Sequence, residues 1–117
     1  MREMSFSQHW AKLEVPGGGL FTTFRFTDWF IGEHALVVLH ARTKVRQALF
    51  VAEIVAKEPR WMYILHPLDG TPRVSEEEAQ ADGFEDAVAM WKWLYDHYPL
   101  ERLYKEPMNK LTLRRIP

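Results

Sequence analysis

Polar residues able to bind a ligand lie within an aromatic segment at residues 20–27. Alternation along a strand would place Thr23 and Arg25 on the same face. A guanidinium can hold a phosphate or a carbonyl in a forked pair of hydrogen bonds, and Thr22 and Thr23 add hydroxyl groups. The pattern predicts a ligand-binding site of Thr22, Thr23 and Arg25. Alternatively, Arg25 pairs with Glu53 or another carboxylate, and the threonines are ordinary strand residues.

A second group of polar residues is cationic: Arg42, Lys44 and Arg46 alternate with other residues in one connection. If this connection is a hairpin tip, all three side chains could follow the phosphate backbone of an RNA. A solvated turn without a ligand is the alternative interpretation.

Trp29 follows the segment that contains Arg25 and precedes a turn at Gly32. Tryptophan can stack on an exposed base of a single-stranded nucleic acid, so Trp29 is predicted to bind ligand. Most tryptophans of a small domain lie in its core, which is the alternative for Trp29 as it is for Trp10 and Trp61.

Metal and cofactor chemistry have little support in the sequence. The five histidines have no metal-binding spacing, and there is no cysteine to provide a thiolate. The glycine run at residues 17–19 lacks the Lys-Ser/Thr of a P-loop and is expected to be a flexible loop. We therefore expect no metal and no cofactor.

The net charge of −1 conceals an uneven distribution along the chain. Residues 75–101 contain one Lys or Arg against eight Asp or Glu, and the rest of the chain carries a net charge of +6. A basic remainder is compatible with RNA binding, because binding depends on where charge is placed. The acidic segment could instead face a basic protein partner or simply solvate helices.

The pattern of apolar residues indicates strands around an acidic helical segment. Ser75 and Glu78 form a capping-box sequence before a short helix that ends at Asp82-Gly83. A longer helix is expected from Glu85 to His97, with a core stripe of Val88, Trp91, Tyr95 and Tyr98. Strands are expected at residues 20–27, 35–41, 48–57, 60–65 and 109–116.

This order predicts an α+β fold, a mixed β-barrel of five to six strands with two helices inserted before the last strand. The length suits one domain, residues 1–117. No run of apolar residues is long enough to span a bilayer, and the first residues do not form a signal peptide. We therefore expect a cytoplasmic protein.

The chain resembles the ASCH family of the PUA-like superfamily over nearly its whole length, through several short motifs in the family's order. The central motif is close to G-x-K-x-x-E/T-x-R and aligns with residues 18–25. The other matching segments are Ser5-Phe6 with Trp10, residues 29–33, residues 51–55, Gly83-Phe84, His97-Tyr98-Pro99 and residues 111–114. The resemblance implies a PUA-like barrel with a cleft lined by Thr23 and Arg25.

The resemblance also implies function. Members are similar to RNA-binding modules, and a few are small hydrolases such as an acetylcytidine amidohydrolase. In those hydrolases a Lys and a Thr of the motif act with a carboxylate, for which Thr23 and Asp82 are the matching catalytic candidates. The Lys position is Leu20, which cannot activate a hydroxyl. We therefore expect an RNA- or nucleotide-binding module, with amidohydrolase and protein-interaction domain as alternatives.

Overall fold

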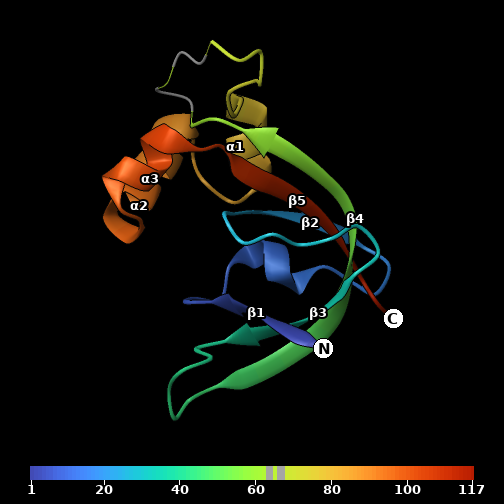
Figure 1. Cartoon of the computed structure of the whole chain (residues 1–117). Coiled ribbons are helices and arrows are strands. Elements are labelled where there is room, and N and C mark those ends of the chain that lie inside the picture. The colour runs from blue at the N-terminus through green and yellow to red at the C-terminus, as the bar shows by residue number, and fades with distance from the viewer. Residues whose placement is uncertain (63–64, 66–67) are drawn as a thin grey trace. The chain divides into compact units, whose positions relative to one another are not determined.

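The computed structural model describes residues 1–62, 65 and 68–117, and in these residues five strands, three α-helices and one 3-10 helix are formed (Figure 1). The strands are β1 (Arg2–Phe6), β2 (Leu20–Arg25), β3 (His34–Leu39), β4 (Gln47–Arg60) and β5 (Met108–Arg115). The helices are η1 (Ala11–Glu14), α1 (Glu76–Ala81), α2 (Ala87–His97) and α3 (Leu100–Lys105). No α-helix among the described residues is long and apolar enough to cross a membrane.

The strands form one mixed sheet in the order β1-β3-β4-β5-β2. β1 is parallel to β3, with Met4 opposite Val37, whereas β3 and β4 are antiparallel, with His34 opposite Glu53. A register shift between Val37 and Val38 marks a bulge in the β3–β4 pairing. The α+β class predicted from the sequence is confirmed at this level.

Four of the five predicted strands are present with small changes at their ends. The fifth, predicted at residues 60–65, is not found in its described part, because Arg60 ends β4 and Trp61 forms only an isolated bridge with Arg73. Residues 63 and 64 of that prediction lie outside the described residues. The fifth strand of the sheet is instead β1, which we did not predict.

The chain divides into two compact units. Unit 1 comprises Met1–Thr22, Trp29–Lys57 and Leu111–Pro117, and unit 2 comprises Thr23–Asp28 and Glu58–Lys110. In unit 1 the alternation of β1 turns Met4 and Phe6 inward to a core that also contains Val37 and Ile54. Burial of such side chains is the main favourable contribution to the stability of each unit.

Unit 2 has a core of its own, to which the end of β2 and all three α-helices contribute. Phe24 packs with Met90 and Leu94 of α2, Leu103 of α3 and Met108 at the start of β5, and all five are at most 5% exposed. These contacts fix the end of β2, where Arg25 is located.

α1 begins with the predicted capping box. The Glu78 amide donates to the Ser75 hydroxyl at 3.1 Å, and the Glu78 carboxylate accepts from the Ser75 amide at 3.0 Å. The helix ends at Asp82, and Gly83 adopts a φ of 111°, which favours glycine. Both ends of this helix therefore follow from local sequence.

The prediction of two helices before the last strand is wrong, because α3 follows α2 directly. Pro99 ends α2, as expected, but its carbonyl also accepts from the amides of Arg102 and Leu103 and so begins α3. Leu103 is 1% exposed and anchors the short helix in the core. A proline favours the first turn of a helix as much as it ends the preceding one.

The core stripe predicted for α2 is only partly correct, because Trp91 and Tyr98 pack against the core of unit 2 but Val88 and Tyr95 do not. The helix buries Ala87, Met90 and Leu94, whereas Val88 and Tyr95 are 40% and 53% exposed. Both stripes have helical spacing, so spacing alone does not distinguish them. The compact stripe faces the core because it fits against Phe24 and Leu103, while Trp91 packs beside Tyr95 and Tyr104 at ring-centroid distances of 6.0 and 6.1 Å.

We predict that Asp86→Ala lowers the free energy of unfolding by about 1 kcal/mol. The Asp86 carboxylate accepts from the Ala89 amide at 2.7 Å and caps α2. Urea unfolding of the variant measures the loss. Asp86→Asn is the matched control, since asparagine caps a helix about as well, and an equal loss in both variants would contradict a capping role.

Candidate functional site

Thr23 and Arg25 lie on one face of β2, as strand alternation predicts. The Arg25 Nε–H group donates to the Thr23 hydroxyl oxygen at 3.2 Å. Thr23 is only 4% exposed, whereas Arg25 is half-buried. The hydrogen bond with the buried hydroxyl therefore helps to orient the guanidinium. Arg25 is the more exposed member of the pair and the one that a ligand could contact.

Two residues from the helical part of unit 2 act on Arg25 electrostatically. Burial lowers the pKa of Arg25 below its usual value, and electrostatic interactions with Tyr98 and Asp82 partly oppose this effect. Asp82 is 5% exposed and lies at the end of α1, and Tyr98 is at the end of α2. We call Thr23, Arg25, Asp82 and Tyr98 the Arg25 group, in which Thr23 forms a hydrogen bond with Arg25 and the other two residues act on its pKa.

Tyr98 was not predicted as a site residue, because it was assigned to the core stripe of α2. Its ring contacts the Phe26 ring edge-on at a centroid distance of 5.3 Å, and the Arg102 guanidinium lies over Phe26 at 4.4 Å. Arg102 is itself paired with Glu106 at 2.7 Å. An aromatic wall thus adjoins the Arg25 group within unit 2.

The structure does not place Thr22 and Trp29 in the Arg25 group. Both residues belong to unit 1, and alternation turns Thr22 to the opposite face of β2 from Thr23. The Trp29 side chain is part of the unit 1 core and 3% exposed, with the Arg2 guanidinium 4.0 Å from its ring centroid. The ring therefore leaves little surface on which a base could stack.

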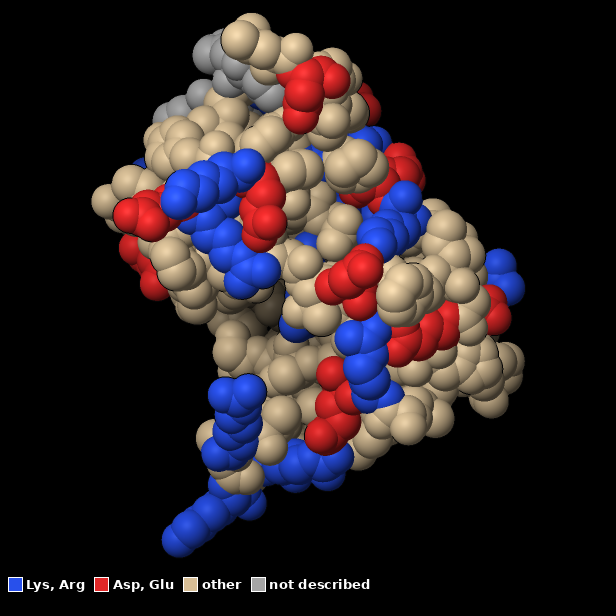
Figure 2. Space-filling model, in the orientation of Figure 1, with Lys and Arg blue, Asp and Glu red and all other residues tan. Residues whose placement is uncertain are grey.

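The basic connection is the tip of the β3–β4 hairpin, the condition under which its cations could follow a phosphate backbone. His40, with a φ of 51°, starts a turn in which its carbonyl accepts from the Thr43 amide and hydroxyl at 3.1 and 3.0 Å. Arg42 and Lys44 are exposed, whereas Arg46 forms an ion pair with Glu3 of β1. Figure 2 shows basic side chains projecting from the end of the molecule where Figure 1 places this hairpin.

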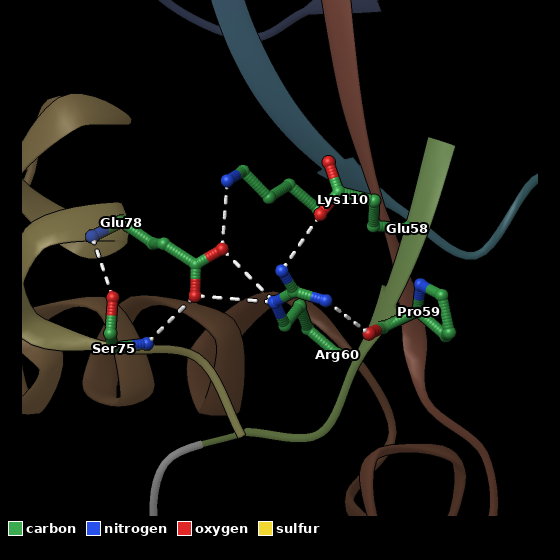
Figure 3. A network of polar contacts seen from close by, with 6 residues as sticks. All are labelled: Glu58, Pro59, Arg60, Ser75, Glu78 and Lys110. Atoms are coloured by element: carbon green, nitrogen blue, oxygen red, sulfur yellow. Dashed lines mark hydrogen bonds and ion pairs between the residues drawn. The ribbon is translucent and has the colours of Figure 1, made fainter. Parts of the chain in front are cut away.

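A second polar cluster, which the sequence did not predict, surrounds Glu78 in unit 2 (Figure 3). Its carboxylate accepts from the Arg60 Nε–H group at 3.0 Å and from the Lys110 ammonium at 2.8 Å. All three side chains are less than 20% exposed. Arg60 also pairs with Glu58 at 2.8 Å, so we call the four residues Glu58, Arg60, Glu78 and Lys110 the Glu78 network.

The charges of the network act on Glu78 itself. Burial raises the pKa of Glu78, but the hydrogen bonds from Lys110 and the Ser75 amide, with the charges of Lys110 and Arg60, outweigh burial and lower the pKa overall. The carboxylate is thus already ionised and fully engaged at neutral pH. This arrangement is suited to joining α1 to β4 and β5, not to proton transfer.

No family model, curated protein or solved structure matches the chain. Within the described residues, no three His, Cys, Asp or Glu side chains gather as a metal-binding group would. The functional interpretation therefore depends on the motif order of the sequence and on the geometry of the Arg25 group and the hairpin.

Proposed function

We propose that the chain is an RNA- or nucleotide-binding module of the ASCH type, with a PUA-like barrel, acting in the cytoplasm. The observation that carries this proposal is the Arg25 group. The residue that ends the family-like motif is a half-buried arginine held by the Thr23 hydroxyl. An arginine oriented in this way presents a fixed set of donors to a ligand.

The hairpin supplies a second, independent reason. Arg42 and Lys44 are exposed on a turn whose backbone is held by its own hydrogen bonds. Cations on such a turn attract the phosphate backbone of RNA without regard to sequence. Arg46 is less available for this role than Arg42 and Lys44, because it forms an ion pair with Glu3.

We predict that Arg42→Gln/Lys44→Gln weakens binding to mixed single-stranded RNA oligomers about tenfold at low salt. If each residue neutralises one phosphate, the slope of log K against log salt should become shallower by about 1.4. Fluorescence anisotropy over a series of KCl concentrations measures both quantities.

The matched control is Lys92→Gln/Lys105→Gln, which removes the same charge from two exposed lysines of α2 and α3. This variant should bind as the unaltered protein does. Equal losses in the two variants would mean that only net charge matters. No binding of the unaltered protein at low salt would overturn the proposal and favour a protein partner for the acidic helices.

A further inference from the structure

α2 and α3 carry an exposed aromatic and apolar surface that is separate from the hairpin and from Arg25. The helices lie next to each other in Figure 1, and the Trp91 ring contacts the Tyr104 ring at a centroid distance of 6.1 Å. Tyr95 and Tyr104 are 53% and 49% exposed, and Val88 and Leu100, each one turn along its helix, are also exposed. Tryptophan and tyrosine gathered at a surface in this way are typical of an interaction site.

A hollow of about 380 Å³ opens on this surface within unit 2. It is lined by Trp91, Lys92, Tyr95 and Asp96 of α2. The rings of Trp91 and Tyr95 have centroids 6.0 Å apart and are tilted by 56°, so a flat group that lies on one ring is bordered by the other. The hollow therefore offers two aromatic walls and one charged group of each sign.

The charges at the hollow favour a cation. Among the residues that the structure describes, neither Asp96 nor Lys92 forms an ion pair, so the Asp96 carboxylate is available to an occupant. Lys92 is exposed, and its flexible stem allows the ammonium group to turn to water. Residues 75–101 contain eight Asp or Glu against one Lys or Arg, so the surrounding field attracts cations and repels phosphates.

We propose that the hollow binds an arginine side chain in a basic segment of a partner protein. The guanidinium lies against the rings of Trp91 and Tyr95 and donates hydrogen bonds to the Asp96 carboxylate. Apolar residues beside that arginine rest on Val88 and Leu100, which are 40% and 41% exposed. This interaction is additional to RNA binding and uses none of the residues proposed for it.

The chemistry of arginine suits this hollow better than that of lysine. A planar guanidinium can lie on an aromatic ring and at the same time donate a pair of hydrogen bonds to a carboxylate. Tryptophan is the ring that attracts a stacked cation most strongly. The chain uses the same contact internally, since the Arg2 guanidinium lies 4.0 Å from the Trp29 ring centroid and that of Arg102 lies 4.4 Å from the Phe26 centroid.

The experiment follows the Trp91 indole N–H signal of ¹⁵N-labelled protein by NMR, with Trp91→Phe used to assign the signal. The probe is a peptide with one arginine between two leucines, and matched peptides carry lysine or citrulline, the neutral isostere of arginine, at that position. The arginine peptide should shift the signal at millimolar concentration and bind about tenfold more tightly than the citrulline peptide, with the lysine peptide between them. Equal binding of the arginine and citrulline peptides, or no shift with the arginine peptide, would overturn the proposal.

Variants of the lining residues test the charge and the rings separately. Asp96→Asn should weaken binding of the arginine peptide about threefold and leave the citrulline peptide unchanged, whereas Lys92→Gln should bind the arginine peptide at least as tightly as the unaltered protein. Tyr95 is 53% exposed, so Tyr95→Ala should keep the fold and weaken binding about threefold. The matched control is Glu77→Gln, which removes an exposed carboxylate of α1 that does not line the hollow and should change nothing. Unchanged binding in Asp96→Asn, or a loss in Lys92→Gln, would contradict a cationic occupant.

RNA is the alternative occupant, because bases also stack on aromatic side chains. The mixed RNA oligomers should leave the Trp91 signal unchanged, and Arg42→Gln/Lys44→Gln should bind the arginine peptide as the unaltered protein does. A Trp91 signal that shifts with RNA and not with the arginine peptide would overturn the proposal. Because the hairpin and the hollow share no residue, failure at one of them is distinguishable from failure at the other.

Discussion

Replacement of Glu78 by glutamine is expected to lower the free energy of unfolding by about 2–3 kcal/mol, because it leaves two partly buried cations without their shared carboxylate. Glutamine retains the size of the side chain and can still complete a capping box, so the loss reports on charge. Arg60 and Lys110 are 16% and 19% exposed and lie on different strands. Urea unfolding of both proteins at pH 7 measures the difference.

The loss of stability in Glu78→Gln is also expected to depend on pH. Because the pKa of Glu78 is lowered in the folded protein, its stabilising contribution is complete above the ordinary carboxylate pKa of about 4.3 and is lost as pH falls through the folded value. The difference in stability between the two proteins should therefore shrink below about pH 4.

The control for Glu78 lies on the same helix. Glu77 is exposed in α1, so Glu77→Gln removes one charge without disturbing the network and should change stability by less than about 0.5 kcal/mol. A loss in Glu78→Gln that equals the control, or that stays constant down to pH 3, would contradict the role of the network.

Arg25→Met is expected to destabilise the protein by about 1–3 kcal/mol, because it leaves the buried Thr23 hydroxyl without its hydrogen bond from Arg25. Methionine retains much of the length of the arginine stem, so little packing is lost. Thr23 is 4% exposed, so water cannot readily replace the lost donor. Urea unfolding again measures the change.

The double variant Arg25→Met/Thr23→Val separates this hydrogen-bond effect from packing. Removing both partners should recover about 1 kcal/mol relative to Arg25→Met, since no unsatisfied hydroxyl remains buried. If the double variant loses the sum of the two single losses, the residues are not coupled, and Thr23 would not hold Arg25 in place.

Features that depend on neighbouring residues were predictable from the sequence. Alternation correctly placed Thr23 and Arg25 on one face, and the capping box of Ser75 and Glu78 is formed as expected. Two strands joined by a basic connection were also expected, and β3 and β4 are the corresponding strands. Each prediction needed only the geometry of a strand, a helix start or a turn.

Features that depend on distant residues were not predictable from the sequence. β1 is short, and the burial of Met4 and Phe6 could be recognised only once the pairing of β1 with β3 is known. The Glu78 network joins residues from two strands and a helix, and Glu78 alone could be recognised only as a cap. Similarly, Tyr98 could be linked to Arg25 only after the helices were placed.

The division of the chain has a consequence for its synthesis on the ribosome. Unit 1 contains Leu111–Pro117, and the buried Leu111 and Leu113 belong to its core. Its remaining residues therefore emerge long before the segment that completes them and must wait while all of unit 2 is made. Domains assembled from contiguous sequence can fold as they emerge, but unit 1 cannot. Its exposed apolar strands would need protection by chaperones until translation has passed residue 117.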